Sequence, residues 1–142
     1  MKVTLPIVCR YFIALTSDKE IGHQQLTEIL APDVKAQTWI LDSSTQQEQL
    51  LVECANRDQV LAILDRSIFD NIEQAEYNLA SYVDNQNGEV VVQLTCRETR
   101  NGNGTETEGP GTYQTAGRQT FIIANNQIVK ITINIESRQK IN

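Results

Sequence analysis

Apolar side chains recur every three or four residues in three segments of the first half of the chain. This is the spacing of one buried face of an α-helix. The segments are 5–16, 17–31 and 56–68. Ser17 or Asp18 is suited to cap the second helix, and Pro32 ends it, because the residue before a proline is pushed toward extended geometry. The pattern therefore predicts three helices.

In the second half the period changes from 3.6 to 2, which indicates strands with one buried face. The predicted strands are 76–83, 90–96, 113–124 and 128–136, and two earlier ones, 34–41 and 49–55, precede the third helix. Residues 85–88, Asn-Gln-Asn-Gly, are typical of a hairpin turn. Residues 99–111 include Asn-Gly twice and Gly-Pro-Gly, which predicts a flexible loop. We expect a loose C-terminal tail from about residue 138.

Helices followed by an antiparallel meander define an α+β domain. We expect the three helices of the N-terminal half to pack on a strongly curved antiparallel sheet of about five or six strands. The trough between the two layers then forms a pocket. Residues 1–142 show no internal repeat and no linker, so we expect a single domain.

Charge and hydropathy exclude several classes of partner. Twelve basic and eighteen acidic residues give a formal charge of −6, which argues against a nucleic-acid surface. No apolar run approaches the roughly 18–20 residues of a membrane span. Arg10 interrupts the apolar run near the start, and no signal-peptide cleavage site follows it. We expect a cytoplasmic protein that binds neither nucleic acid nor membrane.

The cysteines and the single histidine offer no metal site. Cys9, Cys54 and Cys96 are widely spaced without a Cys-x-x-Cys pair, and His23 lies in a polar segment without partners. We therefore predict that the cysteines are small buried hydrophobic residues and that His23 is solvated. No metal and no cofactor is expected.

Three short motifs carry a resemblance to a known superfamily. Residues 10–15 read Arg-Tyr-Phe-Ile-Ala-Leu, residues 30–33 read Leu-Ala-Pro-Asp directly before a strand, and residues 56–58 read Asn-Arg-Asp at the start of the third helix. This order resembles the nuclear transport factor 2-like superfamily, with its ketosteroid isomerases, SnoaL-like polyketide cyclases and binding-only domains. The resemblance implies the cystatin-like cone fold, in which helices and sheet enclose one conical pocket.

The resemblance also suggests where a site would lie. Ketosteroid isomerases use a carboxylate base beside an oxyanion hole made by a tyrosine and a protonated aspartate. In this sequence the resemblance places Tyr11 at the position of the tyrosine. It places Thr38, five residues after Asp33, at the position of the base, and Gln119, or else Thr120, at the position of the neutral acid. Thr38 cannot take a proton at neutral pH, so the base is missing. The expected ligand-binding residues are Tyr11, Thr38 and Gln119, with Leu15, Leu64 and Phe121 as apolar walls.

Three functions fit this sequence. The first is a module that binds a small apolar or weakly polar molecule without turnover. The second is a SnoaL-like isomerase, cyclase or lyase whose acid or base is not placed. Asp42, Asp65, Glu76 and Glu98 are the candidate carboxylates, and the Asp-Arg-Asp set that the resemblance associates with epoxide hydrolases is not recognisable.

The third function is a dimeric association domain whose pocket is residual. Trp39 alternates with Thr38 and so should face the exterior of the sheet. The last strand adds an outer face of Lys130, Thr132, Asn134 and Glu136. Tryptophan is enriched at interfaces, because it buries a large area and keeps a polar group. We expect a homodimer through this sheet face.

Overall fold

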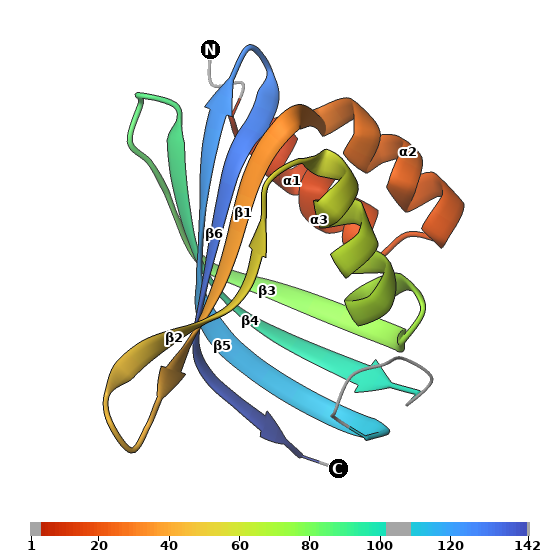
Figure 1. Ribbon diagram of the computed structural model, residues 1–142, viewed down its shortest axis with the longest axis vertical. Helices are drawn as coiled ribbons and strands as arrows, with labels where there is room; N and C mark the ends of the chain where they lie inside the picture. The colour runs from red at the N-terminus through yellow and green to blue at the C-terminus, as the bar shows by residue number, and fades with distance from the viewer. Residues whose placement is uncertain (1–3, 102–108, 142) are drawn as a thin grey trace.

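The computed structural model describes residues 4–101 and 109–141 (Figure 1). The elements in these ranges are α1 (Thr4–Leu15), α2 (Lys19–Ile29), β1 (Leu30–Asp42), β2 (Gln47–Cys54), α3 (Arg57–Leu64), a π-helical segment η1 (Asp65–Phe69), β3 (Ile72–Asp84), β4 (Glu89–Arg100), β5 (Gly111–Ala124) and β6 (Gln127–Lys140). Among the described residues no helix is long and apolar enough to cross a membrane.

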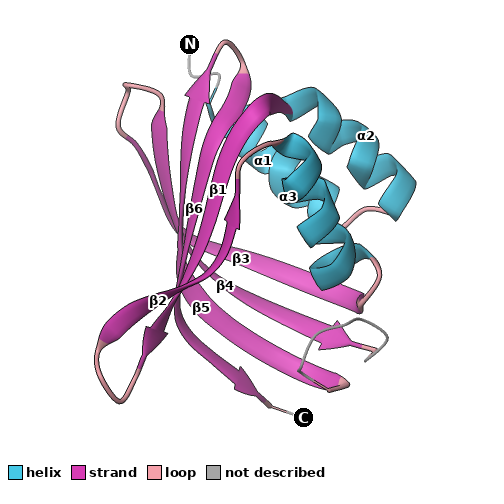
Figure 2. Cartoon of the chain, in the orientation of Figure 1, coloured by secondary structure: helices cyan, strands magenta, loops and turns pink. Residues whose placement is uncertain are grey.

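The six strands form one curved, open sheet in the order β2-β1-β6-β5-β4-β3, and the helices lie on one side of it (Figure 2). This confirms the predicted α+β class. The sheet is mixed, however, because β1 pairs with β6 in parallel, whereas we expected antiparallel pairing throughout. Hairpins connect the antiparallel neighbours. The β1–β6 pair is joined instead by α3 and the whole meander, a connection long enough for parallel strands.

Local sequence explains where the early elements begin and end. Helix α3 begins at the Asn-Arg-Asp triplet, as predicted, and the Asn56 side chain caps it by accepting a hydrogen bond from the Gln59 backbone N–H at 2.9 Å. Helix α2 ends at Ile29, and Leu30 is already extended. Pro32 therefore lies inside β1, within the stretch where the pairing of β1 with β6 is interrupted. Proline has no N–H to donate there.

The hydrophobic core lies between the helices and the concave face of the sheet. Tyr11 and Phe12 of α1 meet Phe121 of β5, with ring centroids 5.3 and 5.9 Å from that of Phe121. Phe121 is fully buried, and the inward residues Val90 and Val92 of β4 are fully buried as well. This end of the concave face is therefore closed by packed side chains.

The sheet bends sharply near the middle of its strands (Figure 1). Register shifts fall there, between Thr38 and Trp39 and between Ala116 and Gly117. Such irregularities increase local twist and bend a strand. At Gly117 an added Cβ would lie 2.2 Å from the Asn134 carbonyl oxygen, so only glycine allows β6 to approach this closely. The bend turns the far ends of the strands around the trough.

Two predictions about irregular segments need correction. Strand β6 continues to Lys140, which pairs with Tyr113, so residues 138–140 are not a loose tail. Strand β4 reaches Arg100 and β5 begins at Gly111, which shortens the predicted loop 99–111. Its central part, residues 102–108, lies outside the described residues.

The predicted dimer face is the outer surface of the sheet. Trp39 is partly buried there within one chain, and its indole N–H donates to the Gln37 side-chain oxygen at 3.2 Å. The homodimer stays a prediction.

Candidate ligand-binding site

Strand β4 shows which side chains face the trough. Its alternate residues from Val90 to Arg100 are all buried, and they share one face of the sheet. The first four are apolar or thiol side chains, whereas the last two, Glu98 and Arg100, are charged and only 7 % and 5 % exposed. The concave face thus changes from apolar to charged along a single strand.

A small cavity lies on the apolar part of this face. Its volume is about 50 Å³. The lining residues come from β3, β4, β5 and β6 and are Tyr77, Leu94, Cys96, Thr115, Gly117, Arg118, Gln119, Ile133, Asn134 and Ile135. The side-chain oxygen of Gln119 is buried and accepts no hydrogen bond from any described residue. A buried acceptor without a donor is costly, and such groups are rare in folded proteins.

Thr38 lies in the same row of the sheet as Gln119. Ile133 of β6 pairs with Thr38 of β1 on one side and with Gln119 of β5 on the other. Next-nearest strands are about 10 Å apart, so the two polar side chains flank Ile133 on one face. Thr38 is not among the residues that line the cavity. The structure therefore brings Thr38 and Gln119 onto one row, with the aliphatic side chain of Ile133 between them.

Tyr11 lies in the core and not on the cavity. It is 2 % exposed and packs edge-on against Phe12 and Phe121, with ring centroids 5.4 and 5.3 Å away. Burial raises the pKa of the phenol far above its ordinary value. Leu15, Leu64 and Phe121, the expected apolar walls, belong to the same core cluster. Of the six expected site residues, Gln119 alone lines the cavity, and the binding role of the others stays a prediction.

A buried charged cluster occupies the far end of the trough. The Arg138 Nη2 donates to Glu98 Oε1 at 2.5 Å, and the Arg100 Nη1 donates to the same oxygen at 3.3 Å. Arg138 also donates to the Thr115 hydroxyl at 2.6 Å, and its guanidinium lies 4.8 Å from the centre of the Tyr113 ring. The cluster therefore joins β4, β5 and β6.

Sequence reasoning missed this cluster for two reasons. The apolar alternation of β4 ends at Cys96, although its inward face reaches Glu98 if the alternation is carried on by one more step. Arg138 was assigned to the tail, because Ser-Arg-Gln-Lys at 137–140 shows no apolar alternation. Its place became clear only from the pairing of β6 with β5.

The thiol and the phenol beside the cluster are neutral at physiological pH. Burial, with the Glu98 carboxylate as the second cause, raises the pKa of the Cys96 thiol to about 12. Burial likewise raises the pKa of Tyr77 well above its ordinary value. Cys96 is thus protonated and does not act as a thiolate nucleophile. Among the described residues no group of His, Cys, Asp or Glu is arranged to hold a metal ion.

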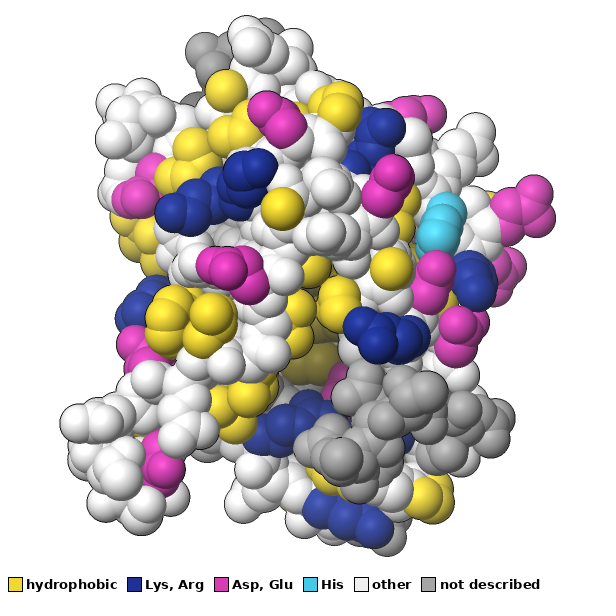
Figure 3. Space-filling model, viewed as in Figure 1, with side chains coloured by type: hydrophobic (Ala, Val, Ile, Leu, Met, Phe, Trp, Pro, Cys, Tyr) yellow, Lys and Arg dark blue, Asp and Glu magenta, His cyan; other side chains and the backbone are white. Residues whose placement is uncertain are grey.

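The molecular surface is hollowed on the side that carries the helices. Figure 3 shows a hollow below α3, with hydrophobic side chains in its depth and basic side chains at its edge. The combination of an apolar interior and a few convergent polar groups is typical of small-molecule sites.

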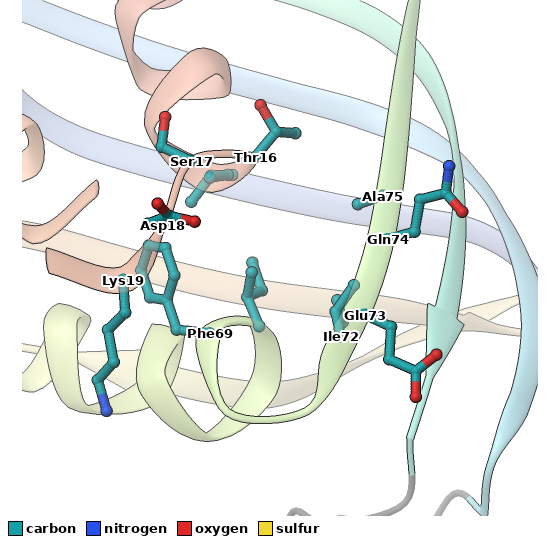
Figure 4. Close-up of a pocket in the computed structure, with 11 residues that line it drawn as sticks. Thr16, Ser17, Asp18, Lys19, Phe69, Ile72, Glu73, Gln74 and Ala75 are labelled. Atoms are coloured by element: carbon teal, nitrogen blue, oxygen red, sulfur yellow. The ribbon is translucent and has the colours of Figure 1, made fainter. Parts of the chain in front are cut away.

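A second groove, of about 350 Å³, lies where α1 and α2 meet the start of β3 (Figure 4). Its polar side chains do not converge. The Thr16 and Ser17 hydroxyls donate to the Ile13 carbonyl oxygen, and Glu73 and Gln74 point away from them on the far wall. Lys19 forms an ion pair with Asp70 at 2.8 Å. We therefore place the candidate site in the trough.

No protein-family model matches the chain, and no curated protein matches it either. Several solved structures, in contrast, match the fold of the chain. A candidate SnoaL-like polyketide cyclase from Jannaschia sp. CCS1 superposes with a TM-score of 0.72 at 13% identity, covering 94% of this chain and 85% of the other. An NTF2-like protein of unknown function from Burkholderia pseudomallei gives 0.65 at 14% identity, covering 96% and 92%.

A structure of an LEH-like epoxide hydrolase from M. tuberculosis gives a TM-score of 0.66 at 10% identity, covering 94% of this chain and 83% of the other. Identities this low establish the fold alone. The protein is therefore an α+β cone with the nuclear transport factor 2-like fold, as the sequence motifs suggested.

Proposed function

We propose that this protein binds a small, largely apolar and uncharged molecule in the trough of its curved sheet, without the base of an isomerase. The observation that carries the proposal is the Gln119 side-chain oxygen, which is buried beside an apolar cavity and accepts no hydrogen bond from any described residue. A ligand with one N–H or O–H group would supply the missing donor.

The lining determines the chemistry of the ligand's inner end. Leu94, Ile133 and Ile135 contribute aliphatic walls, and Gln119 is a neutral amide. Arg118 also belongs to the lining, but it alternates with Gln119 along β5, so its side chain is directed to the other face of the sheet. Burying an ion here would cost several kcal/mol without a counter-charge, whereas one neutral hydrogen bond contributes about 0.5–1.5 kcal/mol. The inner end is therefore uncharged and carries a donor.

The cavity volume limits what fits at the inner end. A cavity of about 50 Å³ is several times the space of one water molecule, yet far below the roughly 300–1,000 Å³ of drug-sized pockets. We propose that a ligand places a small group in the cavity and extends into the hollow seen in Figure 3.

Isomerase chemistry finds no support at the expected positions. Thr38 stands where the base would be, and the Tyr11 ring is enclosed by Phe12 and Phe121. Proton abstraction beside a carbonyl needs a base within hydrogen-bond reach of the substrate.

A second candidate function is an enzyme that uses Glu98, a buried carboxylate on the inward face of β4. The cyclase-like and epoxide hydrolase-like neighbours favour this reading. Glu98 is joined by two guanidinium groups. The Asp-Arg-Asp set that the resemblance associates with epoxide hydrolases is not recognisable among the described contacts of this cluster. Binding without turnover is the better-supported function.

The test uses pyrrole, a small neutral ring with one N–H donor, as a competitor of the fluorescent dye Nile red. Gln119→Leu should weaken pyrrole binding about two- to tenfold, which is the value of one neutral hydrogen bond. Gln114→Leu is the matched control, because Gln114 lies on the same strand and pairs with the exposed Arg97 of the outer face. Failure of Nile red and pyrrole to bind, or equal affinities in the natural chain and Gln119→Leu, would refute the proposal.

A further inference from the structure

We propose that one row of the curved sheet, made by Tyr77, Cys96 and Thr115, binds a carbonyl oxygen of the ligand. In this arrangement the hydroxyl groups of Tyr77 and Thr115 both donate a hydrogen bond to that oxygen. The inference rests on the proposed function and names a second polar group of the ligand, in addition to the donor that pairs with Gln119.

The three residues of the row stand side by side on neighbouring strands. Tyr77 of β3 pairs with Cys96 of β4, and Cys96 pairs with Thr115 of β5. Residues paired in this way share one face of a sheet, with about 4.8 Å between neighbouring strands. All three line the cavity of about 50 Å³ that Gln119 also lines. The row therefore presents two hydroxyl groups and a thiol to one small space.

The Thr115 hydroxyl has its proton available for a ligand. Its oxygen accepts a hydrogen bond from Arg138 Nη1 at 2.6 Å. A hydroxyl group has one proton and two lone pairs, and the guanidinium uses a lone pair. None of the described residues accepts the proton. This one contact with Arg138 also polarises the hydroxyl group, which makes its proton a better donor.

The Tyr77 hydroxyl has a weak partner that a carbonyl oxygen would replace. It donates to the Cys96 sulfur. A thiol sulfur is a weak acceptor, whereas a carbonyl oxygen has two lone pairs and is a strong one. The Tyr77 ring packs against Phe12, with 5.3 Å between the ring centroids. The hydroxyl group is therefore held in one position and gains a better partner when the ligand binds.

The row favours a neutral acceptor over an ion. The pKa of the Cys96 thiol is raised to about 12, first by burial and second by the Glu98 carboxylate, although the Arg138 charge acts in the opposite direction. A negative charge beside Cys96 is therefore costly, and a carboxylate group of a ligand would meet the same cost. An ammonium group has no lone pair to accept from the two hydroxyl groups. The carbonyl of a ketone, ester or amide is uncharged and accepts from both.

The carbonyl row and Gln119 lie two rows apart in the sheet. Gln119 pairs with Val92, four residues before Cys96 on β4, which is roughly 13 Å measured along the strand. The row between them contains Leu94 and Gly117, and Gly117 has no side chain to divide the space. The ligand class that fits is a small neutral molecule with a carbonyl group and, away from it, an N–H or O–H group.

The experiment compares cyclopentanone with methylenecyclopentane, in which a CH₂ group replaces the carbonyl oxygen. NMR titration measures the affinity of both probes for the natural chain, for Tyr77→Phe and for Thr115→Val. In each variant the ratio of ketone affinity to alkene affinity should fall about two- to tenfold, which is the value of one neutral hydrogen bond. Comparison of ratios cancels the different hydration of the two probes and any general change in the cavity.

Thr95→Val is the matched control. Thr95 precedes Cys96 on β4, so its side chain lies on the other face of the sheet, where it lines a groove with Glu76 and Arg97. This variant loses the same hydroxyl group as Thr115→Val and should keep the affinity ratio of the natural chain.

Each other outcome is decisive. An unchanged ratio in either folded variant would overturn the two-donor row, and so would an equal fall in Thr95→Val. If neither five-membered ring binds while pyrrole binding still depends on Gln119, the carbonyl row is wrong and the proposed function stands. If pyrrole does not bind either, both are wrong.

A measurement on the natural chain covers the case in which a variant does not fold. The carbonyl ¹³C resonance of cyclopentanone lies further downfield in water, where the oxygen accepts hydrogen bonds, than in hexane. On binding to the natural chain it should stay near its position in water. A shift toward its position in hexane would show that no hydroxyl group donates to the bound ketone, and would overturn the proposal without any substitution.

Discussion

The two ends of the concave face differ in their side chains, which are aromatic at one end and charged at the other. At one end Tyr11, Phe12 and Phe121 pack ring against ring and fill the space. At the other end Glu98 and Arg138 form a largely buried ion pair. A tyrosine that a motif marks as a site residue is thus part of the core, whereas Glu98, one of four candidate carboxylates, faces inward from β4. The position of an inward residue along its strand determines whether it joins the apolar core or the charged cluster.

The largest expected effect tests the closed end. Phe121→Ala should lower the free energy of unfolding by about 3–5 kcal/mol, because it removes a fully buried ring and leaves a cavity against Tyr11 and Phe12. Urea unfolding measures the change. Leu79→Ala, at a side chain that is 41 % exposed, should cost well under that. Comparable losses in the two variants would mean that this end is not tightly packed.

The next effect tests the charged end. Arg138→Met should lower the free energy of unfolding by about 2–3 kcal/mol, somewhat below the range for fully buried ion pairs, because its side chain is 18% exposed. The exposed Arg97 on the outer face provides the control, and Arg97→Met should change stability by about 0.5 kcal/mol or less. If the two variants are equally stable, the cluster does not hold β6 against β4.

A smaller effect is expected from alkaline pH. The pKa of Cys96 is raised from 9.0 to about 12 in the folded protein, so between these values the unfolded chain loses the thiol proton first. Stability should therefore fall as the pH rises above 9, and the contribution of Cys96 between pH 9 and 10.5 is about 1–2 kcal/mol. Urea unfolding of the natural chain and of Cys96→Ala at both pH values isolates it. Parallel losses in the two proteins would show that Cys96 is not the cause.

The last prediction concerns catalysis, for which we expect no measurable isomerase activity. The natural chain should not isomerise a β,γ-unsaturated ketone, and Thr38→Asp alone should not create an efficient isomerase, because Tyr11 is packed in the core. Absorbance of the conjugated product measures the rate. Activity of the natural chain that disappears in Tyr11→Phe would contradict this comparison of the two ends and favour the enzyme.

Sequence alone predicted those features that depend on neighbouring residues. The start of α3 at residues 56–58, the turn at 85–88 and the inward stripe of β4 follow from local geometry. The parallel pairing of β1 with β6 could not be read from the sequence, because it joins segments with no local signal for each other. The residues of the candidate site were harder to predict from the sequence than the fold. Gln119 came from a motif comparison, whereas Glu98 and Arg138 are polar residues whose burial depends on strands far away in the sequence.

The pairing of the first strand with the last has a consequence for how the protein is made. Thr38 of β1 lies beside Ile133 of β6, 95 positions later. A ribosome releases the chain from its N-terminus, so the helices and β1 emerge long before the strand that completes their sheet. Contacts between such distant segments form slowly and late. The sheet is therefore completed last, when β6, the strand that carries Arg138, pairs with β1.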